Sequence, residues 1–394
     1  MTGKWERVRL GEYILQVRGV SYSPDDVSDT PNGDYIPILR ANNIQNEGLN
    51  FDDLIYIHNS KISQEQLIRE GDIVVCTSSG SKNLVGKSAR AQKGLNVSFG
   101  AFCKVVRVNK TINSQYIGHY FNSPQYRQII SNLSGGANIN NIRNEHIANL
   151  TIPLPPLDEQ KRIAEVLDKA SELIKKRKEQ IRLMDQLAKS LFIEMFGDPV
   201  ENPMGWDVKK LGTITHKITD GVHAKPNYTE SGMPFISVQN ISSGYLNFKK
   251  CKYVSLEDYN QMIKSTFPEY GDILYTKVGT YGIPAYVNTS EKFCLYVSVC
   301  LIKPIHKLIN AKFLSFSLGM PYLKRQADKR IKGIGVPDLH LNQIREFDIC
   351  YPPISLQNEF ADRITVIEEQ KALLQNGLAK METAYKALMQ KYFG

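Results

Sequence analysis

The sequence has few cysteines and no long apolar run, and both absences exclude classes of protein. Its 394 residues include six cysteines with no CxxC spacing, which argues against zinc and disulfide frameworks and favours reduced thiols. No apolar run reaches membrane-spanning length, and the N-terminus lacks the apolar segment of a signal peptide. We therefore expect a soluble, cytoplasmic protein with no membrane partner.

Motifs of common catalytic sites are also missing. The sequence has no GxxxxGK[ST] phosphate loop, no HExxH metal motif and no GxSxG nucleophile turn, and its seven histidines lack metal-ligand spacing. The segment YPPI at 351–354 is similar to the [DN]PP[YF] loop of amino-methyltransferases, but it lacks the Asp or Asn that accepts from the target amine. We interpret it as a helix start, and we expect no metal site and no autonomous methyltransferase.

What the chain does contain is a long helical pattern that occurs twice. Residues 157–196 contain no proline or glycine, and their apolar residues recur at alternating steps of four and three. This 3.5-residue period is typical of a helix whose narrow seam packs on another helix. Adding 197 to each position gives the second copy, in which Ile367 and Leu374 correspond to Ala170 and Arg177, and the charged Lys371 corresponds to Ile174. The predicted seam residues are Ile163, Leu167, Ile174, Ile181, Met184 and Leu191, then Phe360, Ile364, Ile367, Leu374, Leu378, Met381 and Leu388.

The repeat extends into the segments before the helices, where Gly-Asp-Ile at 71–73 recurs at 271–273. Short β-rich runs and short helical patterns alternate there, which predicts an α+β fold. We expect two duplicated globular domains, at 1–153 and 198–350, and two long helices, at 154–197 and 351–394. The helices should pair within the chain as an antiparallel coiled coil with pseudo-twofold symmetry, in preference to pairing between molecules.

Charge points to a partner. The formal net charge is +9, which favours a polyanion such as nucleic acid. Basic loops rich in Gly and Ser suit phosphates, and amide side chains suit base edges, although each loop is also compatible with a solvated surface. We read the basic run at 175–178 as a solvated helix face. The candidate DNA-binding residues are Asn42, Asn43, Ser79, Lys82, Lys87 and Arg90, then Gln239, Asn240, Lys277, Tyr281, Lys324, Arg325, Lys329, Arg330 and Lys332.

Over its whole length the sequence resembles the specificity subunit of type I restriction-modification systems. Each globular domain ends in an Ile-Pro-Leu-Pro-Pro-Leu-x-Glu-Gln-like entry, at 152–160 and 349–357, and a long helix ending in Phe-Gly follows. The second entry departs from the first, since Leu356 stands where the first has Glu159. The Gly-Asp-Ile strands after short helices also fit this family.

The resemblance implies that each globular domain is a target recognition domain that reads one half of a bipartite, asymmetric site on double-stranded DNA. The helix pair would set the spacer between the half-sites and dock two modification subunits. Those partners would hold S-adenosylmethionine and methylate adenine N6, and restriction subunits, where present, would use ATP and Mg. This chain would be a non-catalytic recognition subunit that binds no cofactor itself.

Two alternatives stay open at this point. The chain is also compatible with a recognition subunit whose partner fuses methyltransferase and nuclease in one polypeptide. A coiled-coil scaffold that ignores DNA is the other reading, and it would show no salt-dependent affinity for DNA.

Overall fold

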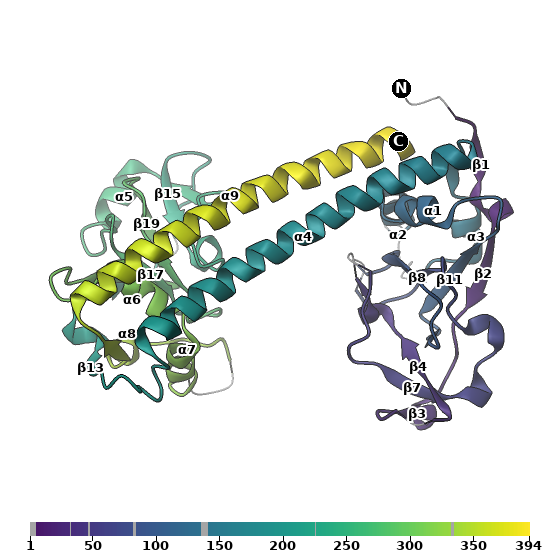
Figure 1. The fold of residues 1–394 in the computed structure, drawn as a ribbon. Coiled ribbons are helices and arrows are strands. Elements are labelled where there is room, and N and C mark those ends of the chain that lie inside the picture. The colour runs from purple at the N-terminus through teal and green to yellow at the C-terminus, as the bar shows by residue number, and fades with distance from the viewer. Residues whose placement is uncertain are drawn as a thin grey trace. The chain divides into compact units, whose positions relative to one another are not determined.

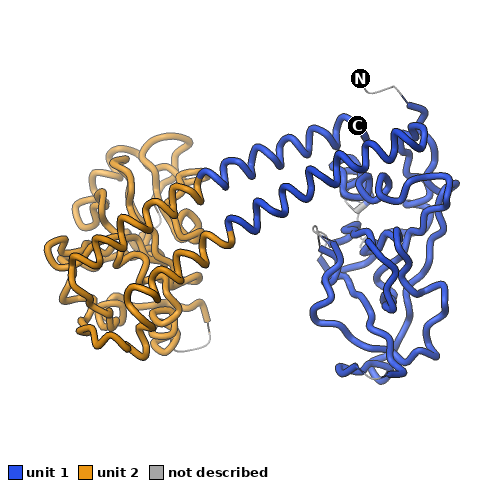
Figure 2. The backbone as a smooth tube through the Cα atoms, in the orientation of Figure 1, with its two compact units in different colours: residues 1–181, 373–394 blue, residues 182–372 orange. Residues whose placement is uncertain are grey.

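The computed structural model describes residues 5–31, 33–45, 48–81, 84–134, 141–224, 226–331 and 335–394. The chain divides into two compact units (Figure 2). Unit 1 contains residues 1–181 and 373–394, and unit 2 contains residues 182–372. Each unit combines strands, short helices and a part of each long helix, as the predicted α+β fold requires. The helix parts are included because they pack into the core of each globular domain.

Two small sheets form the globular part of unit 1. The central antiparallel sheet has the order β2 (Ile14–Arg18), β11 (Cys103–Val108), β8 (Ile73–Cys76), β9 (Ser88–Arg90). The second has the order β10 (Ser98–Phe99), β4 (Tyr35–Leu39), β7 (Ile55–His58), β3 (Val27–Ser28). Two strand pairs complete the sheets: β1 (Arg7–Arg9) with β12 (Thr151–Pro153), and β5 (Ile44–Gln45) with β6 (Gly48–Leu49). The short α-helices are α1 (Ser114–Tyr120), α2 (Pro124–Ser134) and α3 (Asn144–Ala148).

Unit 2 repeats the strand order of the central sheet and of three strands of the second sheet, which confirms the duplication. Its central sheet runs β14 (Thr215–Asp220), β20 (Val299–Pro304), β17 (Ile273–Thr276), β18 (Pro284–Tyr286). The second sheet runs β16 (Lys252–Val254), β15 (Met233–Ile236), β19 (Cys294–Leu295), and β13 (Asp207–Lys210) pairs with β21 (Asp348–Tyr351). The short α-helices are α5 (Leu256–Met262), α6 (Ala311–Leu318), α7 (Pro321–Asp328) and α8 (Leu341–Arg345).

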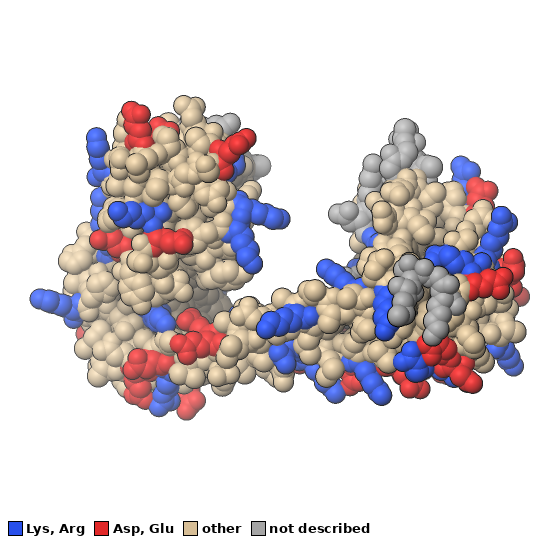
Figure 3. Space-filling view, turned by 90° about the horizontal axis from the view of Figure 1, so that it is seen from above, with Lys and Arg blue, Asp and Glu red and all other residues tan. Residues whose placement is uncertain are grey.

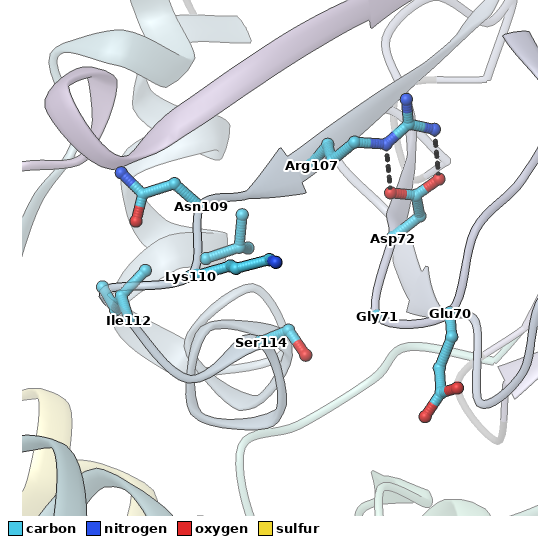
Figure 4. A pocket seen from close by; sticks show the side chains of 9 residues that line it. Glu70, Gly71, Asp72, Arg107, Asn109, Lys110, Ile112 and Ser114 are labelled. Carbon is cyan, nitrogen blue, oxygen red and sulfur yellow. Dashed lines mark hydrogen bonds and ion pairs between the residues drawn. The ribbon is translucent and has the colours of Figure 1, made fainter. Parts of the chain in front are cut away.

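A buried ion pair explains why the Gly-Asp-Ile motif occurs in both units. The carboxylate of Asp72 accepts from Nε and Nη2 of Arg107, at 2.8 and 2.7 Å, beside a surface pocket (Figure 4). Asp272 accepts from Lys303 Nζ at 2.6 Å in the same place. The preceding glycines have φ of +83° and +91°, a conformation that favours glycine. The motif therefore makes the same turn into the central strand twice.

The long helices α4 (Leu157–Phe196) and α9 (Ile354–Phe393) pair in the antiparallel direction, as predicted (Figure 1). In unit 1 the first turns of α4, with Ile163, share a buried cluster with the last turns of α9, with Phe393. In unit 2 the end of α4, with Phe192 and Phe196, shares a cluster with Phe360 near the start of α9. Each helix end is thus buried by the opposite end of its partner.

The predicted seam residues face inward. Ile163, Leu167, Phe360 and Ile364 are buried, and the other nine are half-buried. Burial is complete only where the globular domains also cover the helices, because two helices alone leave part of each seam residue open to solvent.

Charged residues on the helices are accommodated by local contacts. Lys371 of α9 forms an ion pair with Asp185 of α4, with 2.5 Å between Nζ and Oδ1. The guanidinium of Arg177 reaches across to Gly377, where a Cβ atom would collide with its Nη1. A glycine inside a helix is unfavourable, and at this position it leaves room for the Arg177 side chain.

All six cysteines are free and buried. Burial raises the pKa of the Cys103 and Cys294 thiols to about 12 and that of Cys350 to about 11. These thiols are protonated at neutral pH and therefore unreactive. Among the described residues, no helix has the length and apolarity needed to cross a membrane.

Candidate DNA interface

In unit 2, segments that are separate in the sequence form one surface. Tyr281, on the loop after β17, donates from its hydroxyl to Asp328 Oδ1 of α7 at 2.7 Å. Lys324 Nζ lies 3.5 Å from the centre of the Tyr281 ring and 2.5 Å from the same carboxylate oxygen. The amide of Gly279 donates to the carbonyl of Pro337 at 2.8 Å, so residues 335–338 adjoin the same loop. Two candidate residues, Tyr281 and Lys324, are therefore neighbours.

The remaining basic candidates of unit 2 differ in accessibility. Arg325 and Lys329 are exposed. Arg330 is half-buried, because its guanidinium donates to the carbonyls of Gln326 and Glu346 at 2.8 and 2.9 Å. Lys332 lies outside the described residues. Arg325 and Lys329 are thus the better placed of these residues to contact phosphates.

Unit 1 forms the corresponding surface from the equivalent segments. Ser78 forms a β-bridge with Asn141, and the amide of Ile142 donates to the carbonyl of Thr77 at 2.7 Å. Arg127 of α2 donates to the carbonyl of Val85 at 3.2 Å, which joins this helix to the loop. In each unit, this surface is formed by the loop after β8 or β17, by one short helix (α2 in unit 1, α7 in unit 2) and by the segment that follows this helix. We call this surface the loop face.

Three candidates of unit 1 are partly buried at or near this face. The hydroxyl of Ser79 accepts from the amide of Ser81 at 3.2 Å, and Lys87 Nζ donates to Gln45 Oε1 at 3.2 Å. Arg90 is half-buried on β9, with its side chain packed beside Gly118. Lys82 lies outside the described residues.

The surroundings of Asn43 and Asn240 do not favour the predicted base contacts. Both side chains are buried. Asn43 accepts from the amide of Arg40 at 2.8 Å and donates to the carbonyl of Asp52 at 2.7 Å. Asn240 accepts from the amide of Ser237 at 3.0 Å and donates to a loop carbonyl at 3.1 Å. Both amides close a turn and are not available to bases, whereas their neighbours Asn42 and Gln239 are exposed.

The surroundings of Lys277 do not favour the predicted DNA contact either. Its ammonium group is buried between the carboxylates of Asp220 and Asp338, at 3.4 and 3.1 Å. A lysine paired in this way is not free to bind a phosphate. The sequence shows that residue 277 is basic, but it does not show that the carboxylates of Asp220 and Asp338, which are distant in the sequence, pair with it.

A basic cleft of about 690 Å³ lies between the loop face of unit 1 and the helix pair. Its basic lining residues are Lys87, Arg127, Lys175, Lys178 and Lys386, and its acidic one is Glu382. On one wall, His119 Nε2 lies 2.8 Å from Asp168 Oδ1, and this hydrogen bond holds the pKa of the Asp168 carboxyl below its usual range.

Sequence reasoning missed this cleft. It placed Lys175 and Lys178 on a solvated helix face, and the spacing gives no signal for the distant residues that complete the lining. On the face drawn in Figure 3, basic and acidic side chains are interspersed. The net charge of +9 is therefore not gathered into one large patch on that face.

The observed architecture is an internally duplicated α+β protein in which a long helix follows each copy. Residues 2–183 and 203–383 each match the type I restriction modification DNA specificity domain, so the chain belongs to this family.

Known relatives agree with this assignment. The chain is 40% identical to the specificity subunit of the StySPI type I restriction enzyme of Salmonella potsdam, over 99% of this chain and 88% of that one. It is 28% identical to the EcoKI specificity subunit of Escherichia coli K12, again over 99% and 88%. The crystal structure of a type I restriction-modification S subunit from M. genitalium aligns with a TM-score of 0.60 at 16% identity, over 99% of this chain and 96% of that one. At this identity the likeness shows the shared fold.

Proposed function

We propose that this chain is the DNA sequence-specificity subunit of a type I restriction-modification complex, in which each globular domain reads one half of a bipartite site. The observation that carries this proposal is the presence of two specificity domains in one chain, with the same order of strands in the central sheet but unlike residues at equivalent surface positions. Phe102 in unit 1 is 68% exposed, whereas its equivalent Ser298 is 7% exposed. Unlike surfaces on a common scaffold suit two different half-sites.

In this proposal, different residues of the protein contact the DNA phosphates and the DNA bases. Phosphate contacts position a protein on DNA, and base-edge contacts give specificity. The basic cleft of unit 1 and the exposed Arg325 and Lys329 of unit 2 suit phosphates. Binding should therefore weaken steeply as salt concentration rises. A scaffold that ignores DNA would lack this dependence, which separates the two functions.

The helices supply the spacing and the docking surface for two modification subunits. A helix of 40 residues is about 60 Å long at 1.5 Å per residue, and one turn of DNA is about 34 Å long, so the helix spans somewhat less than two turns of the duplex. In unit 2, a groove formed by α4 and α9 contains the exposed side chains of Leu187 and Val366 beside Leu191 and Ile367. Exposed apolar side chains in a groove are typical of a protein interaction site.

Cofactor chemistry belongs to the partners in this proposal. The modification subunits would bind S-adenosylmethionine and methylate adenine N6, and restriction subunits, where present, would use ATP and Mg. A partner that fuses methyltransferase and nuclease would use the same recognition surfaces, and the sequence of the partner gene distinguishes this arrangement.

The purified chain should transfer no methyl group from labelled S-adenosylmethionine to DNA, because the adenine would be flipped into the partner subunit. Scintillation counting of DNA from reactions with the chain alone and with its partners measures this. Transfer by the chain alone, at a rate similar to that of the complex, would show that it is an enzyme.

Exchanging residues 1–153 for the equivalent domain of another specificity subunit should change one half-site and leave the other unchanged. The reason is that one buried cluster of each domain, around Val74 in unit 1 and around Leu274 in unit 2, is formed by residues of that globular domain alone. Methylation-sensitive sequencing of DNA from cells with the chimera measures both half-sites. A change in both halves would contradict independent reading by the two domains.

A further inference from the structure

Behind the loop face of unit 2, a buried lysine is held between two carboxylates. Lys277 Nζ lies 3.4 Å from Asp220 Oδ2 and 3.1 Å from Asp338 Oδ1. The side chains of Lys277 and Asp220 are 5% and 13% exposed, whereas that of Asp338 is 42% exposed. His223 Nε2 also approaches Asp220, at 3.5 Å, from the surface. Asp338 is therefore the carboxylate that this cluster presents on the loop face.

The backbone fixes the position of Asp338. Val278 forms an antiparallel β-bridge with it, and the amide of Leu339 donates to the carbonyl of Lys277 at 2.9 Å. Lys277 holds Oδ1, and Oδ2 has no hydrogen-bond partner among the residues that the structure describes. The cluster thus presents one oriented, open acceptor, a property that selective binding sites require.

The duplicated domain shows that the fold does not need this cluster. Strand pairing makes Arg18 equivalent to Asp220, because they pair with equivalent residues of β11 and β20. The matching bridges and backbone hydrogen bonds make Thr77 equivalent to Lys277 and Asn141 to Asp338. Unit 1 forms the same sheet with Arg18, Thr77 and Asn141 at these positions, and thus without the two carboxylates and the lysine between them. Burying a charged cluster costs desolvation energy, so its presence in unit 2 alone indicates a function of that unit.

We propose that Asp338 reads the exocyclic amino group of a cytosine or an adenine in the half-site of unit 2, and that Lys277 and Asp220 are its positioning residues. This inference rests on the proposed function. Phosphates repel a carboxylate, so its place on a DNA-binding face is favourable only opposite a hydrogen-bond donor. In the major groove, the base donors are cytosine N4 and adenine N6. The exposed Arg325 of α7, on the same loop face, supplies attraction to the backbone.

The test uses the full chain in complex with its modification subunits. Domain exchange first assigns a half-site to unit 2, and a set of duplexes then carries each of the four bases at each position of that half-site. Wild type should require cytosine or adenine at one position. Asp338→Asn should lower discrimination at that position by about 10- to 100-fold, with discrimination in the other half-site unchanged.

Two further variants make the result decisive. Asp338→Glu keeps the charge but moves the carboxylate by one methylene group, and it should also lose discrimination, even if Asp338→Asn proves unstable. Glu201→Gln removes an exposed acid elsewhere in unit 2 and should change nothing. Unchanged discrimination in both Asp338 variants, or equal weakening for every duplex, would overturn the role of Asp338. A wild-type complex without sequence preference would refute the proposed function itself, and this inference with it.

Discussion

Replacing Phe192 with alanine should lower the free energy of unfolding of unit 2 by about 3–5 kcal/mol. Phe192 is fully buried, and its ring centre lies 5.1 Å from that of Phe196 and 5.6 Å from that of Phe360. It also stacks on Phe313 of α6, at 5.9 Å. This ring joins both long helices to the globular domain, so its removal leaves a cavity where three elements meet.

Ile193→Ala is the matched control, because Ile193 is the next residue of α4 and is 42% exposed. We expect a loss of less than about 1 kcal/mol there, as for other surface substitutions. Urea unfolding measures both variants, and two transitions are expected for two compact units. Equal losses in the two variants would contradict the packing described for Phe192.

Inserting four residues into each long helix, after Ile181 and after Ala372, should lengthen the DNA spacer by one or two base pairs. Both insertions lie where the two units divide, so neither globular domain is interrupted. Four helical residues add about 6 Å, and one base pair occupies about 3.4 Å. Insertion in both helices keeps the antiparallel seam aligned on either side, apart from a local change in winding.

Methylation-sensitive sequencing of cells that carry this variant measures the spacer. The matched control inserts the same four residues after Glu201, in an exposed loop outside the helices, and should leave the spacer unchanged. Active methylation with an unchanged spacer in the double insertion would refute the proposal that helix length sets the distance.

The sequence was sufficient to predict the helix pair, because a seam of 3.5-residue period is a local pattern repeated over many turns. Duplication then indicated the antiparallel direction, which the clusters around Ile163 and Phe360 confirm. The repeat also marked the Gly-Asp-Ile turns. The repeat did not reveal why the motif contains an aspartate. The basic residues that pair with this aspartate, Arg107 and Lys303, differ between the copies and lie on a distant strand.

Site prediction was weaker because residue type does not give exposure. Asn43 and Asn240 recur in the repeat, and the structure shows that both are required by a turn. Lys277 carries the charge expected of a DNA contact but is neutralised by carboxylates from two other segments. Conversely, Lys175 belongs to a basic run of ordinary appearance, and only the approach of α2 and α9 places it in a cleft.

The most direct test of the central claim is to sequence the methylated bases of the host genome with and without this gene. The claim is that one chain supplies two unlike DNA-reading domains joined by a helix pair. It predicts adenine methylation in a motif of two different specified parts separated by a fixed number of unspecified base pairs, present only when the gene is intact. A gene-dependent motif that is continuous, or the same methylation pattern in both strains, would contradict it.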